Sequence, residues 1–170
     1  MEAEDRRNAG SGRDETEAER LDRNLGELLG ELRVALPGVQ VLFAFLLVVP
    51  FNARFTELGP GQERLYLLTL LSAGLASAML IAPTAHHRLT FRLQDKDYLV
   101  LAANRLAIAG LTFLALAMTG AIALVTDVVF GGAVTAISVA VIGVAFVVLW
   151  CAWPLKRRAA LGSGNSRRAS

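Results

Sequence analysis

The chain has two histidines, His86 and His87, the side chains best suited to bind a metal ion or to sense protons near neutral pH. They are adjacent, and adjacent side chains on a helix point about 100° apart, so the pair is poorly placed to hold one ion. No third ligand stands beside them, and they follow Pro83 at the end of an apolar run. The pattern favours polar residues at a membrane interface over a metal or proton-sensing site.

Asp127 is the one acidic residue between residues 106 and 153. In mid-membrane a lone carboxylate would be a functional candidate, because an unpaired charge is costly there. The ends of the apolar runs on either side instead place Asp127 in a short external turn. There we expect its carboxylate to cap the N-terminus of the following helix.

Three further polar residues lie within or beside apolar runs. Asn104 and Arg105 stand at the edge of the third run, where an arginine can extend its head group to the interface and could pair with Glu27 or Glu31. For Gln40, inside the first run, we expect a hydrogen bond to a neighbouring helix. The candidate functional positions are therefore Gln40, Asn104, Arg105, Asp127, His86 and His87.

The sequence contains no nucleophile–base pair, metal-ligand cluster or phosphate-binding loop that we recognise. Cys151 is the one cysteine, so an internal disulfide is impossible. The net charge of +2 comes from arginine clusters beside apolar runs, which indicates membrane topology rather than nucleic-acid binding. We therefore expect a protein that is not an enzyme and has no cofactor, metal or nucleic-acid partner.

Four apolar runs, at about 34–51, 65–83, 99–125 and 128–153, must position these residues. Each reaches the roughly 17–25 residues needed to cross about 30 Å of hydrocarbon as a helix. They show no in–out alternation, and open sheet edges cannot face lipid. The sequence thus predicts an all-α integral membrane four-helix bundle over residues 34–153.

An amphipathic helix is predicted at 16–36, ahead of the bundle and at its cytoplasmic face. Thr16 and Glu19 fit a capping box, and leucines recur behind them at helical spacing. Its polar face is more acidic than basic, which suits protein better than an anionic lipid surface, although docking on the bundle, a second subunit or lipid all stay open. Residues 1–15 and the basic segment 154–170 read as disordered tails.

Orientation follows from the positive charges. Of the seventeen Lys and Arg residues, Arg54 and Arg64 alone fall between the first and second runs, and none falls in the 126–127 turn. Because cytoplasmic loops carry the excess of positive charge, the count predicts a multi-pass protein of the plasma membrane with both termini in the cytoplasm.

Three segments together carry a family resemblance: NLGELLGELRVALPGVQVLFAFLLVVPFNARF at 24–55, YLLTLLSAGLASAMLIAPTAHHRLTFR at 66–92 and ANRLAIAGLTFLALAM at 103–118. Over about residues 16–153 the chain resembles a family of small bacterial four-span proteins with a domain of unknown function. Some members carry the automatic label sodium:proton antiporter. The resemblance implies a membrane location and supplies no mechanism, substrate or site residue.

Two functions from different classes remain. The first is a non-enzymatic membrane protein, structural or regulatory, that acts through helix–helix contacts with a homo-oligomeric or other membrane-protein partner. The second is a small ion or solute transporter or channel acting as an oligomer. Ion-coupled transport needs an ionisable group near mid-membrane, whereas Asp127 and Arg105 are both expected at the boundaries.

Overall fold

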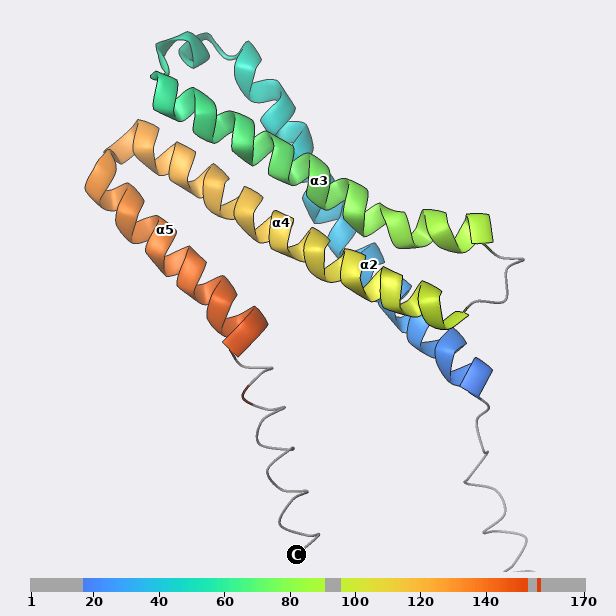
Figure 1. The fold of residues 1–170 in the computed structure, drawn as a ribbon. Helices are drawn as coiled ribbons and strands as arrows, with labels where there is room; N and C mark the ends of the chain where they lie inside the picture. The colour runs from blue at the N-terminus through green and yellow to red at the C-terminus, as the bar shows by residue number, and fades with distance from the viewer. Residues whose placement is uncertain (1–16, 91–95, 153–155, 157–170) are drawn as a thin grey trace, which may run out of the picture.

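Four long helices account for almost all the residues that the computed structural model describes, which are 17–90, 96–152 and 156 (Figure 1). They are α2 (Glu17–Val48), α3 (Pro60–Thr90), α4 (Lys96–Phe130) and α5 (Gly132–Phe146). Each belongs to a segment long and apolar enough to cross a membrane, and no strand occurs in these residues. The all-α prediction is confirmed; the predicted tails lie outside the described residues apart from Lys156.

The predicted amphipathic helix and the first span are one continuous helix, α2, which runs through Pro37. Buried residues explain this continuity, because Leu32, Val39 and Leu46 recur every seven residues and form one seam on both sides of the proline. Thr16, the predicted cap, lies outside the described residues. Pro83 likewise lies inside α3, where the sequence predicted the end of the second span.

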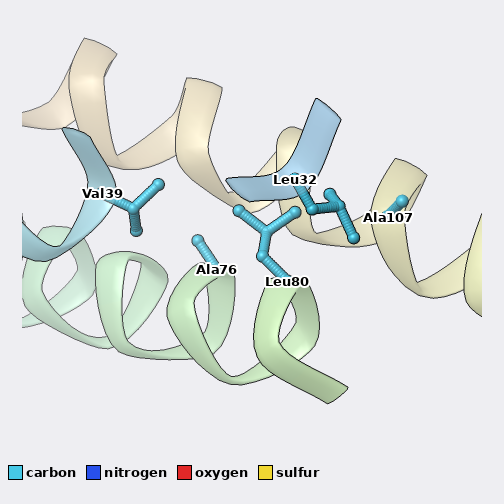
Figure 2. Packing of buried hydrophobic residues seen from close by; sticks show 5 residues of the cluster. All are labelled: Leu32, Val39, Ala76, Leu80 and Ala107. Carbon is cyan, nitrogen blue, oxygen red and sulfur yellow. The ribbon is translucent and has the colours of Figure 1, made fainter. Parts of the chain in front are cut away.

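The core lies where α2 crosses the closely packed pair α3 and α4 (Figure 1). Figure 2 shows one cluster, in which Leu32 and Val39 of α2 point toward Ala76 and Leu80 of α3, with Ala107 of α4 beside them. A second cluster nearer the other end of these helices contains Leu46, Tyr66, Ala73, Ala117 and Leu124. Alanines on α3 and α4 let the two backbones approach closely, as small residues do in membrane helices.

The exit of α2 is held by a side chain of α3. Pro50 has no N–H, so the carbonyl of Leu46, four residues earlier, lacks its usual helical donor. The Tyr66 hydroxyl donates to that oxygen at 2.9 Å in a buried position, and the Phe55 ring packs edge-on against Tyr66. Two short 3-10 helices, η1 (Val49–Phe51) and η2 (Ala53–Glu57), then lead into α3. The chain reversal is thus fixed by buried contacts.

The turn between α4 and α5 differs from the prediction. The third span extends over Val100–Phe130 and the fourth begins at Gly132, so the reversal falls on Gly131 rather than at 126–127. Gly131 has φ of 86°, a conformation that side-chain-bearing residues rarely adopt, and its N–H contacts the carbonyls of Thr126 and Asp127. Asp127 therefore lies in the last turns of α4 and does not cap α5.

Within the described residues, α4 is the one long helix that α5 contacts, on the flank of the bundle (Figure 1). None of its residues is buried, although it is the most apolar of the four spans. It continues into a π-helical turn, η3 (Val147–Ala152), in which Trp150 packs edge-on against Phe146. The architecture is a three-helix core with a fourth helix whose outer faces are left to lipid or to another protein.

Candidate functional site

The six predicted positions do not come together. Asn104 and Arg105 are exposed on α4, and His86 is exposed near the end of α3. Glu27 and Glu31, with which Arg105 could have paired, are also exposed and form no ion pair with it. The side chain of His87 lies outside what the structure describes, and no group of three His, Cys, Asp or Glu side chains in the described part gathers into a metal-binding cluster.

Asp127 has a defined partner that the sequence did not reveal. Gln62 Nε2 donates to Asp127 Oδ2 at 2.8 Å, while Gln62 Oε1 accepts from the N–H of Gly59 at 3.0 Å. A negative charge at the C-terminal end of a helix is disfavoured by the helix dipole, and this hydrogen bond offsets part of that cost. The Gln62 side-chain amide thus joins the start of α3 to the end of α4. We call the region formed by residues 49–62 and 124–132 the loop end of the bundle.

Gln40 lies near the middle of the first span, Gly26–Phe51, and its side chain is exposed. The hydrogen bond that we expected to another helix of the chain does not form among the described residues. In hydrocarbon an amide without a partner costs several kcal/mol, on the order of 2–7 by transfer experiments. The described part of the chain supplies no such partner to Gln40.

Two clefts lie beside α4. The first, which we call the loop-end cleft, has a volume of about 270 Å³ and is formed by the end of α4 with η1 and η2. The second, of about 290 Å³, lies between α4 and α5 and includes Thr112, Thr119, Gly143 and Trp150 in its walls. Neither is lined by any of the six predicted positions.

The two threonine hydroxyls of the α4–α5 cleft already donate to their own helix. Thr112 Oγ1 donates to the carbonyl of Ile108 at 2.9 Å, and Thr119 Oγ1 donates to that of Ala115 at 2.8 Å. Their O–H donors are therefore already used, and only the oxygen lone pairs remain for a ligand. This cleft is an apolar recess and lacks the mid-membrane ionisable group that coupled transport requires.

The sequence analysis did not single out Gln62, Tyr66 or Arg54, which form hydrogen bonds or line a cleft at or beside the loop end. Each acts on a part of the chain far away in sequence or on a cleft that exists only after folding. The usable local signals were small. Gly59 and Gly61 around Pro60 mark a helix start beside Gln62, and Pro50 marks a carbonyl that needs a donor.

Comparison with known proteins shows that residues 14–154 match one protein family, described as Family of unknown function (DUF6328). The matched range is nearly the range over which the sequence resembled a small four-span membrane family. No curated protein and no solved structure matches the chain.

Proposed function

We propose that this chain, which belongs to the DUF6328 family of unknown function, is a non-enzymatic membrane protein with a structural or regulatory role. It exercises this role through contacts between its helices and those of a partner. The partner is a second copy of the chain or another membrane protein. The four apolar helices make it a membrane protein, and the proposal concerns what it does there.

The observation that carries this proposal is the exposed amide of Gln40. One residue along α2, Val39 is fully buried against the core, so Gln40 faces about 100° away from it around the helix. Pro37 and Ala44 lie on the same side and are exposed and short, which allows a second helix to approach. An amide is both donor and acceptor, so two copies of Gln40 can satisfy each other across a symmetric contact.

Replacing Gln40 with leucine should therefore weaken self-association. Interhelical polar contacts in membranes contribute roughly 1–2 kcal/mol, so we expect the association constant to fall about tenfold. Energy transfer between separately labelled copies, reconstituted together in vesicles, measures it.

Thr112→Val is the matched control, because this hydroxyl is also exposed in a span but is bound by its own helix. It should leave association unchanged. Equal association constants for the parent chain and both variants would show that Gln40 does not contribute to the contact. A parent chain that stays monomeric would exclude a second copy as the partner and leave another membrane protein.

We further propose that the protein lies in the plasma membrane with both termini in the cytoplasm. The antiparallel order of the helices supports this. The loop between α2 and α3, which holds Arg54, and the start of α3, which holds Arg64, lie at the end opposite to the start of α2 and the start of α4 (Figure 1). Among the described residues, the other Lys and Arg residues lie toward that other end, in α2 before Pro37, near the end of α3, in the first part of α4 and beyond η3.

Reporter fusions check this orientation. Fusions at residues 1, 93 and 170 should report a cytoplasmic location, and a fusion at residue 58 should report the opposite side, because the translocated loop carries few positive charges. A cytoplasmic signal at residue 58 would overturn the arrangement. Adding lysines to the loop at 56–59 should shift part of the population toward the inverted orientation.

A further inference from the structure

The loop-end cleft has apolar walls and a polar rim. Its walls are valine, leucine and phenylalanine side chains, and its two polar contributors are Asn52 and Arg54. The lining residues are Val49, Asn52, Arg54, Phe55, Leu58, Leu124, Val125, Val128 and Val129. The cleft is amphipathic, with an apolar trough beside a cation and an amide.

The polar contributors are available to a ligand. Arg54 is exposed, and no carboxylate in the described part of the chain pairs with it, including Glu57 three residues away. Asn52 Oδ1 accepts from the backbone N–H of Arg54 at 3.2 Å, which leaves the amide nitrogen of Asn52 free to donate. A guanidinium and an amide N–H together match a phosphate oxygen pair.

The position of the cleft selects the occupant. Val125, Val128 and Val129 on α4 are exposed within the third span, so the trough opens sideways toward hydrocarbon. Arg54 lies in the loop beyond the end of the first span, where lipid head groups lie. The cleft volume of about 270 Å³ is just below the roughly 300–1,000 Å³ of a pocket that encloses a whole small molecule. It suffices for part of a lipid acyl chain, the rest of which stays in the bilayer.

We infer that the loop-end cleft is a binding site for an anionic phospholipid, with its phosphate on Arg54 and Asn52 and one acyl chain along the trough against Val125 and Val128. The bound lipid joins η1 and η2 to the end of α4, next to the hydrogen bond between Gln62 and Asp127. It thereby adds a second tie between the α2–α3 loop and α4. This inference does not depend on the proposed partner contacts.

Native mass spectrometry of the full chain in detergent tests the site, with phosphatidylglycerol and phosphatidylcholine of the same acyl chains as probes. The parent chain should bind phosphatidylglycerol more tightly. Arg54→Gln should weaken that binding about tenfold, because a hydrogen bond to a charged group is lost. Phosphatidylcholine binding should fall by less, because its choline cation already offsets the phosphate charge. Val128→Phe should weaken the binding of both lipids, because the added ring fills the trough.

Arg64→Gln is the matched control, since Arg64 is an exposed arginine near the same end that does not line the cleft. It should bind phosphatidylglycerol as the parent does. An equal loss in the Arg54 and Arg64 variants, or equal binding of the two lipids by the parent chain, would overturn the inference. So would displacement of the lipid by millimolar inorganic phosphate, which would identify a site for free phosphate.

Discussion

Replacing Gly120 with leucine should separate α3 from α4 and lower the free energy of unfolding by about 3 kcal/mol or more. A Cβ atom at position 120 would overlap Thr69 Oγ1 and lie 3.3 Å from Thr69 Cβ. Thr69 is only 2% exposed, and its hydroxyl donates to the carbonyl of Leu65, so it cannot turn aside without losing that bond. Denaturation in mixed micelles, followed by circular dichroism, measures the loss.

The smaller change Gly120→Ala can be compared with a control substitution, Gly143→Ala, and combined with a second substitution, Thr69→Ala. Gly143→Ala changes another helical glycine, around which nothing lies within 4 Å of the new Cβ, so it should be neutral or stabilise by up to about 1 kcal/mol through helix propensity. Gly120→Ala should instead destabilise, and less so when Thr69→Ala removes the clashing hydroxyl. Stabilisation by both alanines would show that α3 and α4 are not in close contact at Gly120.

The four spans were predictable because the bilayer imposes a length and a composition on each helix. Runs such as 65–83 and 99–125 have no other stable solution, since a spanning segment must satisfy its own backbone hydrogen bonds. The leucine spacing of α2 was equally informative, and its residues Leu28, Leu32 and Leu36 do face the core or its edge. Features set by the solvent and by one helix's own periodicity can be read from sequence.

The helix limits depended on rules that tertiary packing overrides. Pro83 suggested the end of the second span, and the amphipathic helix was predicted to end at residue 36, yet α3 continues through Pro83 and α2 through Pro37. Pro83 is itself fully buried. At the last turn, Asp127 looked more like a loop residue than Gly131 did. Among the residues that the structure describes, Gly131 alone has a positive φ, and the pair Gly131-Gly132 was the stronger turn signal.

The contacts of the loop end were beyond sequence reasoning for a different reason. In a bilayer the lipid-facing and core-facing sides of a helix are both apolar, so hydropathy does not separate them. Leu80 is fully buried while Ile81 beside it is 41% exposed, and nothing in their types tells them apart. Pairings such as Gln62 with Asp127, 65 residues apart, follow only once the faces are known.

Replacing Leu28 and Leu32 together with serine should detach the first part of α2 from the core. Leu32 is 4% exposed and packs with Ala76, Leu80 and Ala107 (Figure 2). Leu28 is partly buried against the same cluster. Each buried leucine lost leaves a cavity as well as a hydroxyl in an apolar site, so we expect a combined local cost of about 3 kcal/mol or more. Pro37 marks the boundary of the detached part, because the helix already lacks one backbone bond there.

Hydrogen exchange of the full chain in detergent gives the measurement. Amides at residues 17–36 should exchange about a hundredfold faster in the double variant, while those of α3 and α4 keep their protection. Val34→Ser is the control, because Val34 is 82% exposed and its loss removes no packing, so its exchange should resemble that of the parent chain. If residues 17–36 already exchange freely in the parent, the seam through Leu32 does not hold this half of α2 to the bundle. Rapid exchange extending past Pro37 would instead show that α2 opens as one unit.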